Sequence, residues 1–425
     1  MSAVQELMRG LAKFDVLAYG GEAHRVGRQE LARDESIKDT ISSLSALAAD
    51  VSNTGSVEID RPTYNLIEVS RLFLEAQDYI MAQEKPRYEP YAAALVLRHI
   101  LGIDGSHDLA VTRRKIWSVF EQKVKEQIAF DSAAIAGTAD QEKVGFCPQV
   151  ARARCEILQT VRQIIPVRTE LRVCPSRPVD RSLLDVAGES TGTSAVRSLL
   201  VFPQTSCHDE VSFLHAIHMS ECLFWGSLLF VQRTLAALHS GQIALALPLV
   251  IMASEFAAPL VKLFHSVRKM PPEHFLGFRD ATGEASAVQS LSWQLLDAHM
   301  YGVIPEKTEA LSAAPELRRV LLLATPSFVP LVEMMQHLGG SAAEEAVHER
   351  VVELDHHLRG WRKFHEKQLA GRKDPGYLPP DAPGTGGTAG YGYLASQTLP
   401  PALRFDGCTQ ATPPKKASRS AATPH

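Results

Sequence analysis

The strongest constraint on the fold of this chain is an apolar repeat between residues 347 and 361. Apolar residues recur there at alternating steps of four and three: Val347, Val351, Leu354, Leu358 and Trp361. This spacing predicts one long helix with a single buried face. The next step of four reaches His365, so we expect its imidazole on that buried face. Three other histidines, His348, His356 and His357, fall off the repeat and are expected in solvent.

Helix-like periodicity extends over much of the 425-residue chain. Further long helices are expected at 210–238, 242–269, 287–302, 316–335 and 342–370, whereas alternating strand patterns are scarce. The predicted fold class is therefore all-α, a helical bundle. Residues 1–195 are expected to form an extra N-terminal helical region of unknown role, with helical patterns at 67–83 and 113–130 and connections near 131–147 and 174–195. Residues 399–425 are rich in Pro, Ala, Ser, Thr and Lys, which predicts a disordered tail.

Composition excludes several classes of partner. The formal net charge of -4 gives no indication of a nucleic acid or a membrane surface. The six cysteines lack metal-ligand spacing and are expected as free thiols in a reducing compartment. The longest apolar run, 243–253, contains Pro248 and is shorter than the roughly 20 residues of a bilayer span, so we expect a buried helix there. The N-terminus has no signal-peptide pattern, and the sequence predicts a cytoplasmic protein.

His365 has two interpretations at this point. A lone histidine on an apolar face is most often a core residue with satisfied ring nitrogens, but a buried neutral imidazole is also a natural axial ligand for heme iron. The spacing leaves both open. A glycine-rich loop follows the helix, Gly384-Thr385-Gly386-Gly387-Thr388-Ala389-Gly390. Its backbone N–H groups could approach an anion or a carboxylate closely, and the alternative is a flexible linker.

Three blocks of the sequence resemble the tryptophan 2,3-dioxygenase superfamily, in the same order. The family's His-Asp-Glu…Phe-Ile…His-Gln-x-x-Glu-Leu-Trp-Phe helix is matched by His208-Asp209-Glu210, Phe213-Leu214, Glu221 and Phe224. Its Phe-Arg, then Ser-Gly-Phe-Gln-Ser, an aromatic residue and Leu-Leu-Glu are matched by Phe278-Arg279, Ser286-Ala287-Val288-Gln289-Ser290, Trp293 and Leu295-Leu296-Asp297. Its Trp-Arg-x-x-His and Gly-Thr-Gly-Gly-Ser-Ser-Gly are matched by Trp361-Arg362-Lys363-Phe364-His365 and the loop at 384–390. The resemblance covers 196–398.

The chain departs from the family pattern on the distal side. Ile217 replaces the family's distal histidine, and His218 occupies the neighbouring glutamine position. Consecutive helical residues point about 100° apart, so His218 is expected to share a face with Glu221 and Cys222 and not with Phe213. The family's active-site tyrosines have no counterpart between Ser182 and Cys207, and Ala389 replaces a loop serine. These differences concern the substrate more than the heme.

The resemblance implies a tryptophan/indoleamine 2,3-dioxygenase-like bundle with a heme domain at 196–398 and heme b, with its iron, as cofactor. His365 would be the proximal iron ligand, and no catalytic side chain is required. Arg279 would bind the substrate carboxylate, and Thr385 with the loop amides would contact the amino-acid head group or a heme propionate. The pocket would be lined by Phe213 and Ile217, with His218 as the alternative distal polar group. The side chains and loop residues expected against the heme are Trp361, Ser286 and Gly386.

The implied activity is insertion of O2 into the indole C2–C3 bond of tryptophan or a derivative, giving an N-formylkynurenine-type product as in tryptophan catabolism by the kynurenine pathway. The implied partners are a small aromatic amino acid and O2, in a homo-oligomer, either a tetramer or a dimer. One alternative is a heme-dependent monooxygenase or peroxygenase acting on tyrosine or a modified tryptophan in secondary metabolism. The other is a non-catalytic heme-binding helical protein.

Overall fold

The computed structural model describes residues 108–137, 146–166, 205, 207–279, 290–312 and 317–370, which form helices and turns with no strand among them. The long helices are α7 (Leu109–Ile135), α8 (Pro148–Ile164), α10 (His208–His239), α11 (Ile243–Ala257) and α17 (Ala342–Ala370). The short helices are α12 (Leu260–Val267), α13 (Pro272–Arg279), α14 (Leu291–Tyr301), α15 (Thr308–Ser312) and α16 (Leu331–His337), with 3-10 turns η4 (Pro305–Lys307) and η5 (Arg318–Leu323). The all-α prediction is confirmed.

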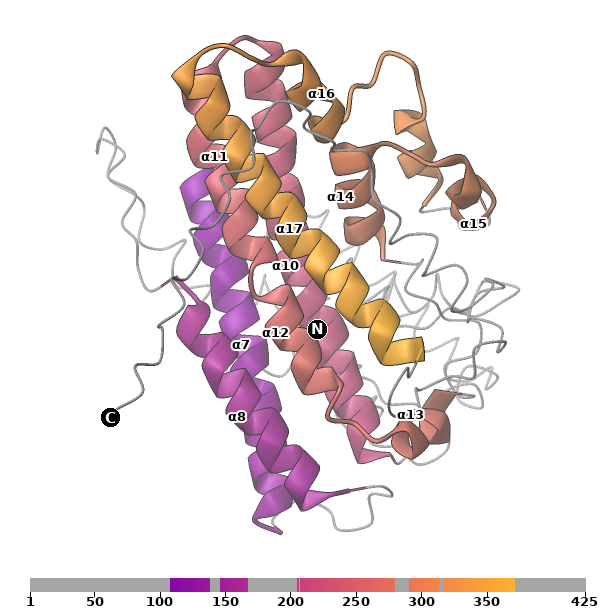
Figure 1. Cartoon of the computed structure of the whole chain (residues 1–425). Helices are drawn as coiled ribbons and strands as arrows, with labels where there is room; N and C mark the ends of the chain where they lie inside the picture. The colour runs from indigo at the N-terminus through magenta and orange to yellow at the C-terminus, as the bar shows by residue number, and fades with distance from the viewer. Residues whose placement is uncertain are drawn as a thin grey trace, which may run out of the picture.

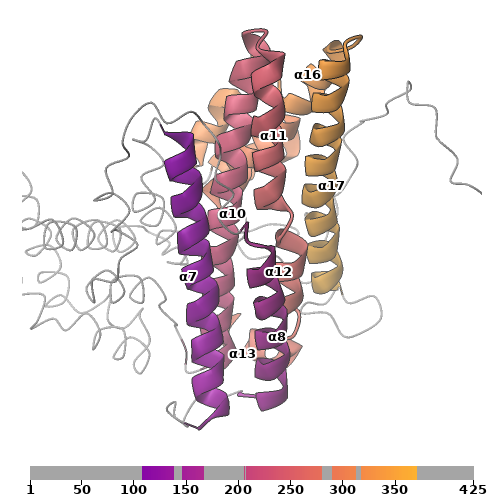
Figure 2. The same cartoon turned by 90° about the vertical axis from the view of Figure 1, so that its left-hand side faces the viewer.

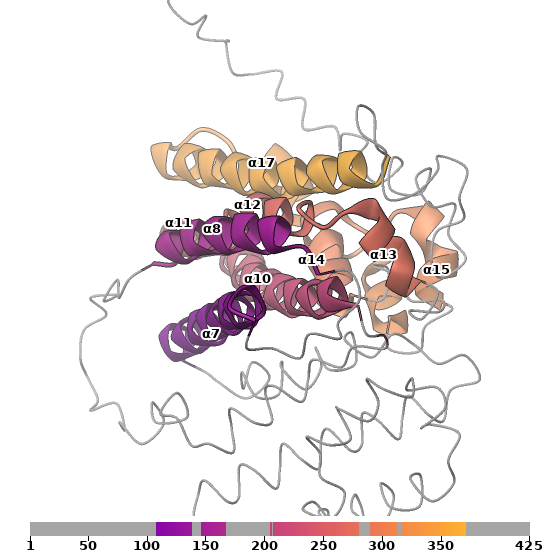
Figure 3. The ribbon, with the colours of Figure 1, turned by 90° about the horizontal axis from the view of Figure 1, so that it is seen from below.

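α10 is the central helix of the bundle. Nearly all of its residues are buried, because it packs against α7, α11, α12 and α14. Figures 1 and 2 show α7, α10 and α17 as long helices of the bundle, with α11 and α12 following one another beside them. Seen from below, α10 lies between α7 on one side and α12 and α17 on the other (Figure 3). The N-terminal end of α10, the C-terminal end of α17 and α13 therefore lie toward the same end of the molecule (Figure 1).

One hydrophobic core joins segments on both sides of residue 195. Phe120 of α7 and Leu158 of α8 belong to the same buried cluster as Phe230 of α10 and Leu354 of α17. α7 and α8 are thus part of the bundle, and the division into domains at 195 stays a prediction. The predicted helix at 67–83, the connection at 174–195 and the tail at 399–425 lie outside the described residues.

Three local predictions differ from the structure. The single helix expected at 242–269 is divided between α11 and α12 at Pro259, which lacks the N–H needed to continue the helical hydrogen bonds. The helix expected at 316–335 is divided between η5 and α16, with Pro330 as the N-cap of α16. α8 has no counterpart among the predicted helices, and α7 continues through Asp131 into the expected connection.

Two stretches, His208–His239 and Ile243–Val267, are long and apolar enough to cross a membrane by length and composition. In the first, 94% of the most apolar window is buried inside the bundle, and in the second 50%. The prediction that 243–253 is buried is correct for one face only. Ala246 and Val250 face the core, whereas Leu245 and Ile251 are exposed.

α10 and α11 approach each other closely at Gly226. A Cβ at this position would lie 2.4 Å from the ring of Phe256, so only glycine fits beside that side chain. The Phe256 ring stacks on Trp117 of α7 with centroids 4.4 Å apart. Gly226 therefore allows three helices to meet around one aromatic ring.

Candidate functional site

His365 lies near the C-terminal end of α17, one turn after Trp361. Its ring centroid is 5.2 Å from that of Phe264 on α12 and 5.8 Å from that of Trp361. The residue keeps some exposure, but the imidazole is enclosed densely enough that burial lowers the pKa of His365 to about 4. The ring is therefore neutral at pH 7, the form in which imidazole binds a metal.

Aromatic rings from three other helices surround Trp361. Its ring centroid is 4.5 Å from that of Trp293 on α14, 5.0 Å from Phe224 on α10 and 5.3 Å from Phe264 on α12. Such edge-to-face packing has a preferred geometry, unlike purely aliphatic contact. The cluster therefore fixes both the position and the rotation of α17 one turn before His365.

A buried ion cluster reinforces this contact between α14 and α17. Arg362 and Lys307 both donate hydrogen bonds to the carboxylate of Asp297. The guanidinium of Arg362 also lies over the rings of Trp293 and Tyr301, with its carbon 4.6 Å and 5.3 Å from their centroids. Arg362 and Asp297 belong to two of the resembling blocks, and the resemblance implies no role for either residue.

Glu221 of α10 attaches the start of α14 to the core. Its buried carboxyl group accepts hydrogen bonds from the hydroxyls of Ser290 and Ser292. Ser290 is also the N-cap of α14 and accepts a hydrogen bond from the backbone N–H of Trp293 at 3.2 Å. Burial raises the pKa of Glu221 to about 7, against the lowering effect of the two serine hydrogen bonds.

One face of α10 carries Phe213, Ile217 and Phe224. These residues are four and seven positions apart, which places them close to one line along a helix. Phe224 contacts Trp361 of α17, and Phe213 packs at 5.5 Å against the fully buried Phe278 of α13. Arg279 follows Phe278 at the end of α13 and is half-buried. The structure therefore brings Phe213 and the segment bearing Arg279 together.

His218 lies on a different face of α10. The pKa of His215 is lowered by burial, and then by Lys123 of α7 and by His218, so these three groups are neighbours. Lys123 also has a lowering effect on the pKa of the buried Cys222 thiol, against the larger raising effect of burial. Cys222 lies one turn after His218. His218 therefore shares the α7 side of α10 with His215 and Cys222. The expectation that Ile217, not His218, faces the iron remains a prediction.

The remaining predicted site residues, Ser286, Thr385 and Gly386, lie outside the described residues. In the described ranges, no group of three or more His, Cys, Asp or Glu side chains could hold a metal ion. A single neutral imidazole in an aromatic setting suits an ion whose other ligands come from a macrocycle, as in heme. The four described cysteines, Cys147, Cys155, Cys207 and Cys222, are free thiols, as expected.

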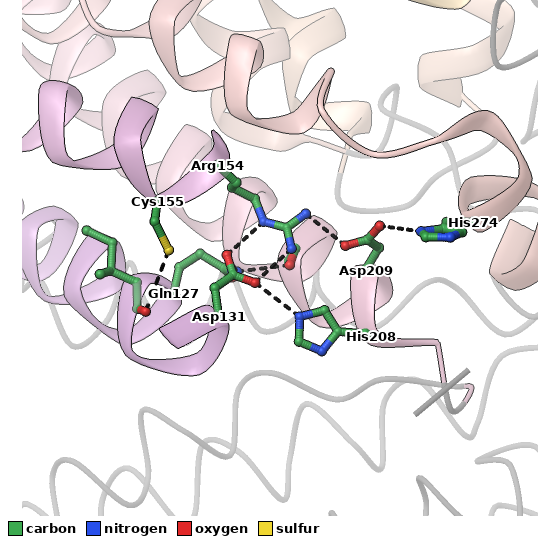
Figure 4. Close-up of polar contacts among 9 residues, drawn as sticks. Gln127, Asp131, Arg154, Cys155, His208, Asp209 and His274 are labelled. Atoms are coloured by element: carbon green, nitrogen blue, oxygen red, sulfur yellow. Dashed lines mark hydrogen bonds and ion pairs between the residues drawn. The ribbon is translucent and has the colours of Figure 1, made fainter. Parts of the chain in front are cut away.

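A second buried polar network lies at the end of the bundle that carries α13 (Figure 4). It joins Asp131 of α7, Arg154 of α8, Asp209 of α10 and His274 of α13. Asp209 and Glu210 occupy the first turn of α10, where carboxylates offset the exposed N–H groups of the helix. In addition, Asp209 is buried in ion pairs, and Glu210 accepts hydrogen bonds from the backbone and hydroxyl of Thr205.

Comparison with known proteins agrees with the resemblance. A tryptophan 2,3-dioxygenase from Anaeromyxobacter dehalogenans (strain 2CP-C) is 28% identical over 234 residues, covering 47% of this chain and 86% of that protein. A tryptophan 2,3-dioxygenase from Ruegeria sp. (strain TM1040) is 26% identical, covering 45% of this chain and 80% of that protein. Another from Caulobacter vibrioides (strain ATCC 19089 / CIP 103742 / CB 15) is 25% identical, covering 46% of this chain and 86% of that protein. No protein-family model matches the chain. Over about half of its length, this chain is similar to proteins of the tryptophan 2,3-dioxygenase superfamily.

Proposed function

We propose that this chain is a heme-dependent dioxygenase that inserts O2 into the indole C2–C3 bond of tryptophan or a tryptophan derivative. The observation that carries the proposal is the joining of two separate sequence blocks beside His365. Arg362 pairs with Asp297 and Trp361 packs on Trp293, so the resembling segments are also in contact in space. Chance similarity in two unrelated segments gives no reason for such a contact.

His365 would hold the heme iron through its neutral imidazole. Bound heme would supply the iron that activates O2, which is chemistry that side chains alone do not provide. The apolar face of α10, with Phe213 and Ile217, would exclude water and orient the indole. The cofactor would also be contacted by Trp361, Ser286 and Gly386.

Arg279 would bind the carboxylate of the amino acid, because a guanidinium can donate two parallel hydrogen bonds to it. Thr385 and the neighbouring loop amides would contact the same head group. A distal hydrogen-bond donor is not part of the proposal, since His218 lies on the α7 side of α10. The homo-oligomeric state and the cytoplasmic location belong to the proposal and have support from sequence only.

The test is an absorbance spectrum of the purified chain after reconstitution with heme. We expect a stoichiometric Soret band that shifts with CO and with tryptophan, and an N-formylkynurenine-type product under O2. His365→Ala should lose the stoichiometric heme while keeping its helical circular dichroism, and His356→Ala, at an exposed position of α17, should keep it. Full heme binding by His365→Ala would reject the ligand assignment. Hydroxylated tyrosine as the product would identify the monooxygenase or peroxygenase alternative, and heme binding without turnover would identify a non-catalytic module.

A further inference from the structure

α13 has a polar attachment that is distinct from its aromatic contacts. Phe278 belongs to a small apolar cluster with Cys207 and Met270, separate from the main core of the bundle. The polar attachment is His274, whose Nδ1–H donates to Oδ2 of Asp209 at 2.6 Å. The short helix that ends in Arg279 is therefore tied to the first turn of α10 by one buried carboxylate.

The other oxygen of Asp209 is held by α8. Arg154 donates from Nη1 to Oδ1 of Asp209 at 2.8 Å, and its Nε and Nη2 donate to Asp131 of α7 at 2.8 Å and 2.7 Å. His208 also contacts Asp131, at 3.0 Å. Figure 4 shows the resulting row of side chains from α7 through α8 and α10 to α13.

This row is enclosed, and its geometry depends on arginine. The exposed fractions of the Arg154, Asp131 and Asp209 side chains are 3%, 0% and 3%. A planar guanidinium can donate to two carboxylates at fixed angles, whereas a lysine ammonium is a single point donor. Losing one partner of a buried ion pair leaves the other charge without compensation, so the arrangement resists local displacement.

We propose that Arg154 is a positioning residue for the substrate: through Asp209 and His274 it fixes α13, and with it the carboxylate-binding side chain of Arg279. This rests on the function proposed above, in which Arg279 binds the amino-acid carboxylate. Arg154 lies in α8, before the region 196–398 that carries the resemblance. The inference therefore gives part of the N-terminal region a role in substrate binding.

The test compares Arg154→Lys with Arg162→Lys, a matched change in the same helix. Arg162 is a half-exposed arginine whose contact is with Glu121, away from the network. In the heme-loaded protein, we expect Arg154→Lys to weaken tryptophan binding at least fivefold in a Soret titration, with unchanged heme stoichiometry and with KM affected more than kcat. Arg162→Lys should match the wild type. Hydrogen exchange of the α13 amides should be faster in Arg154→Lys only, and this readout does not depend on heme or turnover.

His274→Ala is a second test of the same inference. His274 is partly exposed, and its loss removes only the hydrogen bond between α13 and Asp209. It should weaken tryptophan binding to a similar extent, and combining it with Arg154→Lys should add little, since both act through Asp209. The inference is overturned if the wild type responds to tryptophan while both single variants bind it equally well. Faster α13 exchange in a chain whose wild type gives no tryptophan response would instead reject the proposed function, and with it the substrate role of Arg154.

Discussion

Arg362 of α17 and Asp297 of α14 form a buried ion pair three residues before His365. Asp297 also accepts a hydrogen bond from Lys307, whose pKa is lowered to about 7 by burial, so one carboxylate is the shared partner of two basic groups from different segments. The planar guanidinium of Arg362 rests on Trp293, whose ring also packs against Trp361. Polar and aromatic contacts therefore hold the same part of α17, and they determine where the imidazole of His365 lies.

Asp297→Asn should destabilise the protein strongly. It removes the carboxylate that Arg362 and Lys307 share, and breaking a buried ion pair by removing one side costs about 3–5 kcal/mol. Urea unfolding followed by circular dichroism measures the change. Glu353→Gln on the exposed side of α17 is the control, because its partner Arg350 is also exposed and such pairs contribute about 1 kcal/mol or less. Equal effects of the two substitutions would show that the Asp297 cluster does not stabilise the fold.

The position of His365 could be predicted from sequence because helical periodicity is local. Each step of four or three between Val347 and Trp361 fixes the face of the next residue, and all five residues of the repeat are buried as expected. The distinct faces of Phe213 and His218 follow from the same geometry. The helix breaks at Pro259 and Pro330 were missed because the apolar pattern continues across them.

The network around Arg154 could not be predicted in this way. Its ion pairs join residues that are 23, 55 and 65 positions apart, and no periodic pattern relates them. In the sequence, Arg154 also resembles the exposed arginines of the same helix. Burial of a charge becomes apparent only when the positions of α7, α8 and α10 are known together. The roles of Ser286, Thr385 and Gly386 remain predictions from the resemblance.

Replacing Arg279 should weaken substrate binding without affecting heme. A zwitterionic amino acid loses hydration at its carboxylate on entering an apolar pocket, so a charged partner is needed there. Charge-assisted hydrogen bonds are worth about 1.5–3 kcal/mol, and Arg279→Leu should therefore reduce tryptophan affinity about tenfold or more. The tryptophan affinity of Arg279→Lys should lie between those of the wild type and Arg279→Leu, because lysine keeps the positive charge but cannot donate two parallel hydrogen bonds to one carboxylate. Soret titrations measure both, with Arg233→Leu on the exposed side of α10 as the control. Unchanged affinity in Arg279→Leu would mean that this residue does not bind the carboxylate.

Gly226→Ala should destabilise the junction of α7, α10 and α11. The added methyl group would lie 2.4 Å from the Phe256 ring, which cannot move freely because it stacks on Trp117. Overpacking of this kind costs about 1–3 kcal/mol. Gly360→Ala in α17 is a matched control, since its new Cβ would be 3.7 Å from Val261, an ordinary contact. We expect it to be neutral or stabilising, by up to about 1 kcal/mol from helix propensity. The comparison fails if thermal melting ranks the two variants in the opposite order.

Glu221 should make the stability of the protein fall as pH rises from 4.5 to about 7. Its pKa is raised from 4.5 to about 7 by burial, against the opposing hydrogen bonds from Ser290 and Ser292. Below pH 4.5 the group is protonated in both the folded and the unfolded chain, so it contributes no pH dependence. Between the two values the unfolded chain ionises while the folded chain keeps its proton, so the free energy of unfolding decreases with pH. The total loss is about 3 kcal/mol at roughly 1.4 kcal/mol per unit, and it is complete above pH 7.

Glu221→Gln removes this titration and can keep both serine contacts. The difference in unfolding free energy between variant and wild type should therefore shift by that amount in favour of the variant between pH 4.5 and 8. Glu349→Gln, exposed on α17, should follow the wild type over the same range. A constant difference between Glu221→Gln and wild type in urea unfolding at these pH values would show that Glu221 is already ionised in the fold.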